Sequence, residues 1–238
     1  MKKINSKNNV KRDIVIIGGG PAGLSLACSL ADTHLKITII EKQSAKHLSS
    51  PSYDGREIAL THFSKKILED LGVWKHIPSS PISPIKEAKV LDGNSSYVLH
   101  FDSHKVHKEA LGYLVSNHLI KKALYKKVIT RPNIEIITNT SVVEVNSKKQ
   151  YATVKTSNKK TLRTSLIVAA DSRFSQTREN MGISASINDF ERVAIVCRMQ
   201  HEKRHHNIAY ECFYYGETLA VLPLMKNTSS IIMTIPTE

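Results

Sequence analysis

The sequence has few cysteines and few aromatic residues. Its three cysteines, Cys28, Cys197 and Cys212, are an odd number without a C-x-x-C pair, which argues against a disulfide scaffold and a cysteine metal site. Aromatic residues make up only 6% of the chain and do not interleave with the basic clusters. A groove that stacks single-stranded nucleic acid is therefore not expected, and no nucleic-acid partner is predicted.

Long apolar runs are also missing. The uncharged run at residues 14–31 follows a lysine-rich start and imitates a signal peptide. However, Gly18-Gly19-Gly20-Pro21 interrupts it where a continuous apolar helix would break. With 41% hydrophobic and 23% charged residues, the composition predicts a soluble globular protein in a reducing, cytoplasmic setting.

Acidic residues are scarce relative to basic ones. The 34 Lys and Arg exceed the 21 Asp and Glu, which gives a formal net charge of +13. The lysines are scattered in small clusters, which is typical of a solvated surface. His201, His205 and His206 lie close together in the sequence, but the segment reads as an exposed turn between strands, so no metal site is predicted.

Residues 13–41 follow the order strand, glycine turn, helix, strand. Residues 13–17 are a short β-branched apolar run, residues 21–31 are typical of a helix, and the apolar run at 36–40 ends at Glu41. Two parallel strands need a crossover helix of this kind. The pattern predicts a β-α-β unit.

The strongest motif is Gly18-Gly19-Gly20-Pro21-Ala22-Gly23, which matches G-x-G-x-x-G between the first strand and the helix. The first glycine permits a tight turn, the second lets backbone N–H groups approach a pyrophosphate, and the third allows close packing of helix on strand. The helix N-terminus adds N–H donors and partial positive charge. We therefore predict that Gly18, Gly20, Pro21, Ala22 and Gly23 bind a dinucleotide, with an unliganded glycine turn as the alternative.

Glu41 ends the second strand, 23 residues after Gly18. A carboxylate at this place accepts hydrogen bonds from a ribose hydroxyl pair and disfavours a 2′-phosphate. The adenosine is therefore predicted to belong to FAD or NAD. The adjacent Lys42 joins the candidate cofactor-binding residues.

The rest of the chain predicts further helices and strands. Helices are predicted at residues 64–71, 114–128 and 175–181. Segments 85–91 and 97–101 flank Asp92-Gly93 and predict a hairpin. Other strands are predicted at 134–137, 142–145, 151–156, 162–169, 193–199, 208–215, 218–222 and 230–235.

Several segments resemble the FAD-dependent aromatic hydroxylases of ubiquinone biosynthesis, which are single-component flavin monooxygenases. Beside the glycine unit they are Asp54-Gly55-Arg56-Glu57-Ile58-Ala59-Leu60, Leu71-Gly72-Val73-Trp74, Leu111-Gly112-Tyr113-Leu114-Val115 and Ala169-Ala170-Asp171-Ser172-Arg173-Phe174-Ser175-Gln176-Thr177-Arg178. These segments follow the family's order and cover most of the chain.

The resemblance implies an α/β fold, with an FAD-binding Rossmann-like domain of the glutathione-reductase type interleaved with a β-rich substrate domain. The FAD-binding domain would comprise residues 1–77 and 109–183, and would be incomplete at its C-terminus. Residues 78–108 and 184–238 would form the substrate domain.

The resemblance adds Arg56, Asp171 and Ser175 to the candidate cofactor site. The Arg56 guanidinium would neutralise pyrophosphate charge, with a surface arginine as the alternative. Asp171 would belong to the family's second cofactor motif, Ala-Asp-Gly, with a turn carboxylate as the alternative. Ser172 replaces the glycine of that motif, and its Cβ would strain a backbone of positive φ.

The implied activity is an FAD-dependent, NAD(P)H-consuming monooxygenase that uses O₂ to hydroxylate an aromatic, prenylated ubiquinone precursor. Because the flavin would carry this chemistry, the sequence predicts no catalytic acid or base. Phe213-Tyr214-Tyr215 is a candidate to face the ring, with plain sheet core as the alternative. Two other functions stay open: another FAD-fold oxidoreductase, such as a catabolic aromatic hydroxylase or a prenyl reductase, and a truncated non-catalytic FAD-binding remnant or split subunit.

Members of this family are longer and carry a Gly-Asp motif near the flavin ribityl chain. None of the ten glycines here is followed by Asp, so we expect the N-terminal part of such an enzyme, with a C-terminal partner chain among the candidates. A quinone precursor dissolves in membranes, so peripheral contact with the inner membrane, helped by the basic surface, is a further expectation.

Overall fold

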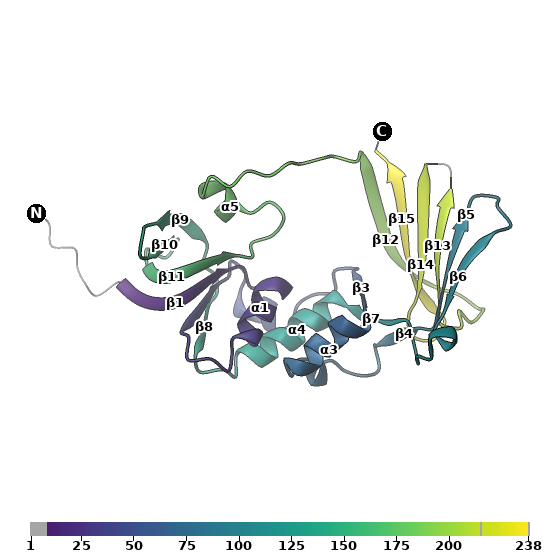
Figure 1. The fold of residues 1–238 in the computed structure, drawn as a ribbon, viewed down its shortest axis with the longest axis horizontal. Helices are drawn as coiled ribbons and strands as arrows, with labels where there is room; N and C mark the ends of the chain where they lie inside the picture. Colours follow the sequence, from purple (N-terminus) through teal and green to yellow (C-terminus); the bar gives the residue numbers. More distant parts are fainter. Residues whose placement is uncertain (1–8, 215, 238) are drawn as a thin grey trace, which may run out of the picture. The chain divides into compact units, whose positions relative to one another are not determined.

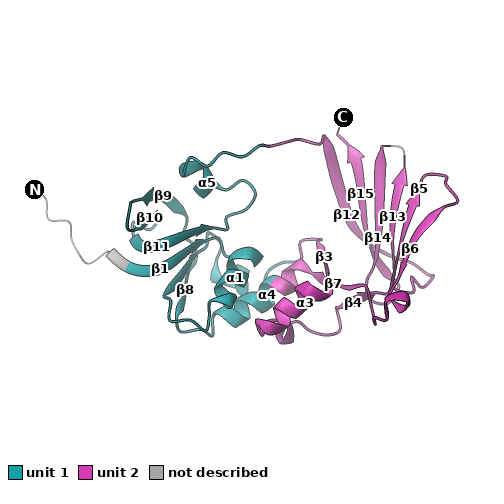
Figure 2. Cartoon of the chain, in the orientation of Figure 1, with its two compact units in different colours: residues 1–52, 121–186 teal, residues 53–120, 187–238 magenta. Residues whose placement is uncertain are grey.

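The computed structural model describes residues 9–214 and 216–237. The chain forms two compact units (Figure 2). Unit 1 comprises residues 1–52 and 121–186, and unit 2 comprises residues 53–120 and 187–238. The domain limits given above follow from the family resemblance and stay a prediction. Among the described residues, no helix is both long and apolar enough to cross a membrane.

Unit 1 is built around sheet A, in which six strands have the spatial order β8-β2-β1-β11-β10-β9 (Figure 1). These strands are β1 Asn9–Ile17, β2 Ile37–Ile40, β8 Ile134–Ile137, β9 Val142–Ser147, β10 Ala152–Thr156 and β11 Thr161–Ala169. Strands β8, β2, β1 and β11 are parallel, whereas β10 and β9 continue the sheet in antiparallel pairs. The carboxyl ends of β2, β1 and β11 therefore meet at one edge, where open α/β sheets bind ligands.

The helices of unit 1 are α1 Pro21–Ser29, α2 Ala45–Ser49 and α5 Gln176–Asn180, together with most of α4 Asn117–Val128. Leu24 of α1 and Leu124 of α4 are fully buried, as are Val15, Ile16 and Ile39 of the sheet. The carboxyl-terminal half of β1 and all of β2 are buried on both faces, which explains their continuous apolar sequence.

The described residues of unit 2 form two sheets. Sheet C has the order β12-β15-β14-β13-β5-β6, and sheet B has the order β3-β7-β4. The strands of sheet C are β5 Glu87–Asp92, β6 Val98–Asp102, β12 Arg192–Gln200, β13 Ile208–Tyr214, β14 Glu217–Pro223 and β15 Thr228–Pro236. Those of sheet B are β3 Glu57–Leu60, β4 Ser83–Ile85 and β7 Gly112–Ser116, and the helices are α3 His62–Asp70, η2 Trp74–His76 and η3 His104–Val106.

Sheets B and C pack together through a small apolar cluster. Ile85 and Leu114 of sheet B lie against Ala209 of β13 and Leu224, which directly follows β14. This contact holds the two sheets of unit 2 in a fixed relation at one end of sheet C.

Several sequence predictions are confirmed. The fold is α/β, and β1 and β2 are parallel strands joined through α1, as the β-α-β pattern predicts. Strands β5 and β6 form the predicted antiparallel hairpin around Asp92-Gly93. The four predicted strands after residue 190 form one antiparallel run, β12-β15-β14-β13.

The helix predicted over residues 114–128 is wrong in its first turn. Residues up to Ser116 belong to strand β7, which pairs on both sides, with β3 and with β4. Leu114 and Val115 are fully buried, so both faces of this short strand are covered. Apolar residues in succession fit a strand buried on both faces as well as they fit a helix, and the sheet pairing decides between the two.

Candidate functional site

The glycine loop lies at the carboxyl end of β1, and the chain itself requires two of its glycines. Gly18 has φ +110°, and a Cβ there would lie 2.3 Å from the carbonyl oxygen of Ala170. A Cβ on Gly23 would lie 2.0 Å from the carbonyl oxygen of Gly18. These contacts allow the turn after β1 and the close packing of α1 against it.

Gly20 differs from these two glycines. It is the N-cap of α1 with φ −76°, a conformation open to any residue, and a Cβ there would meet nothing within 4 Å. Nothing in the described chain therefore demands glycine at this place. A Cβ would fill only the open space in front of the loop, where the motif seats a pyrophosphate.

The N-terminus of α1 has no competing anion of its own. No side chain caps the helix, Pro21 stands in its first turn, and that turn contains no acidic residue. The first backbone N–H groups, those of Ala22 and Gly23, are therefore left for an external anion.

Glu41 follows β2 directly and is buried, with 7% of its surface exposed. Its Oε2 accepts a hydrogen bond from the Gly19 amide at 2.5 Å, and its Oε1 accepts one from the Gln43 amide at 2.8 Å. Glu41 thus fixes the shape of the glycine loop. Each carboxylate oxygen keeps a further lone pair that a ribose hydroxyl can use. The neighbouring Lys42 is exposed.

Asp171 lies beside the glycine loop, because the Ala170 amide donates to the carbonyl oxygen of Ile17 at 2.7 Å. Ser175 Oγ donates to Asp171 Oδ1, and Thr177 donates to Oδ2 through its amide at 3.1 Å and its hydroxyl at 2.8 Å. Burial alone would raise the pKa of Asp171, but these hydrogen bonds outweigh it and hold the pKa below its usual value.

Ser172 has φ +94°. The backbone therefore adopts at this position the positive φ that glycine, the residue of the family motif, adopts easily. A residue with a Cβ is strained in this region. The serine side chain is exposed, which avoids a clash with the core but leaves the backbone strain in place. The structure thus brings Gly18–Gly23, Glu41, Asp171 and Ser175 together at one edge of sheet A.

Arg56 belongs to unit 2, just before β3. Its guanidinium pairs with Asp54 Oδ2 at 2.6 Å, and its side chain is 62% exposed. Asn117 Nδ2 also donates to Asp54 Oδ2, at 2.7 Å. Burial would raise the pKa of Asp54, but the hydrogen bonds from Arg56 and Asn117 lower it overall. The predicted contact of Arg56 with a pyrophosphate stays a prediction.

The aromatic cluster divides between the two faces of sheet C. Phe213 and Tyr214 are neighbours in β13, so they point to opposite faces, and both are about half exposed. Tyr215 lies outside the described residues. The prediction that this cluster faces a substrate ring stays a prediction.

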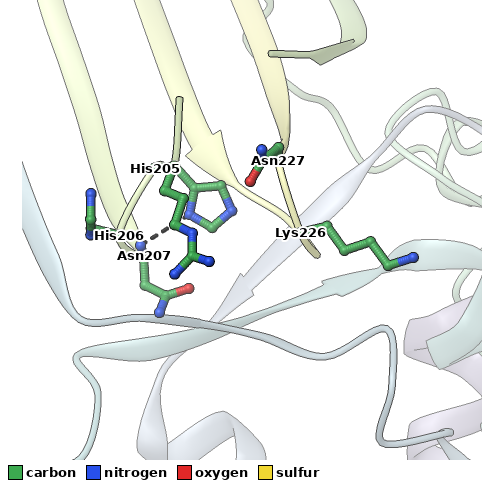
Figure 3. Close-up of a pocket in the computed structure, with 6 residues that line it drawn as sticks. His205, His206, Asn207, Lys226 and Asn227 are labelled. Atoms are coloured by element: carbon green, nitrogen blue, oxygen red, sulfur yellow. Dashed lines mark hydrogen bonds between the residues drawn. The ribbon is translucent and has the colours of Figure 1, made fainter. Parts of the chain in front are cut away.

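A cleft of about 460 Å³ opens among the turns at one end of sheet C (Figure 3). It is lined by Arg204, His205, His206, Asn207, Lys226 and Asn227. His205 Nδ1 accepts from the Asn207 amide at 3.0 Å, while the side chain of Lys226 extends away from His205 (Figure 3). Among residues 9–214 and 216–237, no three His, Cys, Asp or Glu side chains gather as metal ligands would.

Sequence reasoning missed one polar cluster of unit 2. Glu57 of β3, Ser116 of β7 and Arg198 of β12 contact one another. The only signal in the sequence was Glu57 itself, a charged residue at the head of the short run Glu57-Ile58-Ala59-Leu60. Its partner Arg198 lies 141 positions away, and no local pattern connects the two.

Comparison with known proteins agrees with this geometry. A family model described as "FAD binding domain" matches residues 11–238. Among curated relatives, the ubiquinone hydroxylase UbiM of Neisseria meningitidis is 46% identical over 230 residues, covering 95% of this chain and 50% of the relative. The 3-demethoxyubiquinol 3-hydroxylase of Escherichia coli is 24% identical, covering 94% of this chain and 57% of the relative.

Solved structures share the fold. The p-nitrophenol 4-monooxygenase PnpA of Pseudomonas putida superposes with a TM-score of 0.78 at 18% identity, covering 97% of this chain and 58% of that one. PieE, a flavin-dependent monooxygenase solved with FAD and substrate, gives a TM-score of 0.76 at 15% identity, with 95% and 43% covered. The chain spans about half the length of the curated relatives it matches. These matches confirm the resemblance inferred from the sequence motifs.

Proposed function

Because the chain belongs to the FAD-binding domain family, we propose that it is the FAD-binding part of an NAD(P)H-consuming monooxygenase that hydroxylates an aromatic ring of a ubiquinone precursor. The names of the UbiM and E. coli relatives support a quinone precursor over the substrate of a catabolic hydroxylase or a prenyl reductase. The substrate and the activity belong to the proposal.

The observation that carries the proposal is the open space in front of Gly20. Gly18 and Gly23 are explained by contacts within the chain, but Gly20 is not. The chain has room for a side chain at Gly20, and its glycine is explained by a ligand that needs this space. The uncapped N-terminus of α1 offers N–H donors to a phosphate at the same place.

In this proposal each group has a binding role. The amides of Ala22 and Gly23 bind the pyrophosphate, with Gly18, Gly20 and Pro21 shaping the loop. Glu41 accepts from the ribose hydroxyls while holding Gly19, and Lys42 lies at the same strand end. Asp171, oriented by Ser175, lies beside the loop, and Arg56 offers an exposed guanidinium to the cofactor phosphates. Bound FAD, reduced by NAD(P)H, supplies the chemistry that activates O₂.

The proposal also covers the cellular location of the protein and its partner chain. We propose that the protein works in the cytoplasm in peripheral contact with the inner membrane, where its prenylated substrate dissolves, and that a partner chain supplies further parts of the site. The formal charge of +13 favours contact with anionic lipid. Vesicle pelleting tests this contact, since salt-sensitive binding to anionic but not neutral vesicles is expected.

The test of the cofactor proposal is the visible spectrum of the purified chain after addition of FAD and removal of free flavin. A flavin spectrum that stays with the protein supports the proposal, and NAD(P)H oxidation that rises with added aromatic substrate would support the activity. Folded protein that retains no flavin would contradict FAD binding by this chain.

A further inference from the structure

Four side chains of unit 2 form a cluster that the cofactor site does not use. Glu57 begins β3, Ser116 ends β7 and Arg198 lies in β12, while Tyr53 lies in the loop before β3. The Glu57 side chain is only 2% exposed, whereas that of Arg198 is 42% exposed. A buried carboxylate thus meets a half-exposed guanidinium.

The contacts hold Arg198 in one orientation. Its Nη2 donates to Glu57 Oε1 and, at 3.1 Å, to Ser116 Oγ. Ser116 Oγ in turn donates to Glu57 Oε2 at 2.9 Å. The guanidinium carbon lies 4.1 Å from the ring centroid of Tyr53, whose hydroxyl donates to Glu57 Oε1 at 3.3 Å. Two acceptors and a stacked ring therefore fix the guanidinium plane.

Part of the guanidinium remains for a ligand. Nε and Nη1 have no hydrogen-bond partner among the residues that the structure describes, although they carry three N–H donors. Since Glu57 balances the charge, the pair offers fixed donors without a net positive charge. Such a site suits a neutral oxygen acceptor better than an anion.

The face of sheet C that carries Arg198 is polar at one end and apolar beyond it. The register places Ser230 of β15 directly opposite Arg198, and Ile232 opposite Val196. Ser230 is fully buried, and its Oγ has no hydrogen-bond partner among the described residues. Val196 is 42% exposed, and Ala220 of β14 lies beside Ile232. An open apolar strip therefore begins next to the free donors of Arg198.

The same face disfavours a negatively charged ligand. Glu211 of β13 pairs with Ala220, so its carboxylate lies on this face, in the row of Val196 and three strand spacings, or about 14 Å, across the sheet from it. A flat apolar ring with a neutral oxygen matches an apolar strip that ends at a guanidinium. A ring with a carboxylate would face the negative charge of Glu211, and the charge of Arg198 is already balanced by Glu57.

We propose that Arg198 binds an oxygen atom of the neutral phenol or quinol ring that the proposed monooxygenase hydroxylates, and that Glu57, with Ser116 and Tyr53, positions Arg198. This proposal rests on the proposed function for the identity of the ring. The competing role is structural, in which the Arg198–Glu57 ion pair only joins sheets B and C.

The test is equilibrium binding of 2-methoxyphenol to the 238-residue chain in the presence of FAD, followed by NMR of the probe. Arg198→Gln is expected to weaken probe binding about tenfold, which corresponds to about 1.4 kcal/mol, and Arg198→Lys to recover part of the loss. Glu57→Gln is expected to weaken binding as well, because Arg198 loses its anchor. The matched control is Arg192→Gln in the same strand, whose Nη1 donates to the carbonyl oxygen of Gly216 and which should leave probe affinity unchanged.

Two further readouts separate the roles. The melting temperature of Arg198→Gln should fall, because the buried Glu57 carboxylate loses its charge partner, but FAD affinity should stay within error. 4-Hydroxybenzoate, an anion at neutral pH, should bind more weakly than 2-methoxyphenol. The proposal is overturned if wild type does not bind 2-methoxyphenol, if Arg198→Gln binds it like wild type, or if probe affinity and FAD affinity fall together with no recovery in Arg198→Lys. Failure to bind FAD with intact, Arg198-dependent probe binding would instead contradict the proposed function alone.

Discussion

Substitution of Gly20 by alanine should change the affinity for FAD and leave the stability of the fold nearly unchanged. The φ of −76° suits alanine, and the new Cβ would meet nothing within 4 Å. Alanine is a poorer N-cap than glycine, which destabilises the folded protein by less than about 1 kcal/mol. Alanine also reduces the conformational freedom of the unfolded chain, which stabilises the folded protein by less than about 1 kcal/mol. The free energy of unfolding should therefore change by less than about 1 kcal/mol.

Binding of FAD should respond very differently to Gly20→Ala. A methyl group in front of the loop would hold a pyrophosphate away from the amides of Ala22 and Gly23. Hydrogen bonds to a charged group contribute about 1.5–3 kcal/mol each, so the loss of one or two weakens FAD binding by about 100-fold. The control is Gly23→Ala, whose Cβ would lie 2.0 Å from a carbonyl oxygen and which should impair the fold itself.

The assay pairs urea unfolding with an FAD titration on the same preparations. Unchanged stability with strongly weakened FAD binding in Gly20→Ala is the expected result. If Gly20→Ala binds FAD like wild type, the reasoning that places a pyrophosphate at this loop is refuted.

Three other substitutions test neighbouring parts of the site. Ser172→Gly should raise the free energy of unfolding by about 1 kcal/mol and the melting temperature by about 2–4 °C, because relief of strain at φ +94° exceeds the entropy cost of glycine; an unchanged or lower melting temperature would argue against strain. The lowered pKa of Asp171 means that its carboxylate stabilises the fold above the unfolded pKa near 3.9 and that this contribution is lost as pH falls through the lower folded value. Asp171→Asn should therefore flatten the acid side of the stability curve measured by urea unfolding between pH 6 and 2, and an identical slope would contradict the hydrogen-bond account. Glu41→Gln should cost about 1–3 kcal/mol of unfolding free energy and weaken FAD binding, since an amide cannot accept from both the Gly19 and Gln43 amides; a variant as stable as wild type would contradict this role.

The glycine unit could be predicted from sequence because its determinants are local. The strand before Gly18, the helix after Gly20 and the carboxylate at Glu41 follow one another within a single β-α-β unit. Each step has a short-range physical reason, and the structure places them at one sheet edge. The strained φ of Ser172 could also be foreseen, because the family motif has glycine there.

The parts that sequence reasoning missed depend on distant pairing. The apolar pattern of Leu114 and Val115 predicts the start of a helix, because it does not reveal the neighbouring strands β3 and β4 of strand β7. From the sequence alone, Glu57 is an ordinary charged residue at the head of an apolar run. Only the placement of β12, far along the chain, shows that its carboxylate is buried against Arg198.

Binding of the ADP half of FAD at the glycine loop of unit 1 is the step on which the proposed function depends. The purified chain is titrated with FAD and, in parallel, with FMN, which lacks the AMP part of FAD, and binding is followed by flavin fluorescence. We expect that FAD binds, that FMN binds far more weakly, and that added ADP displaces FAD. Equal binding of FAD and FMN, or no displacement by ADP, would contradict this expectation.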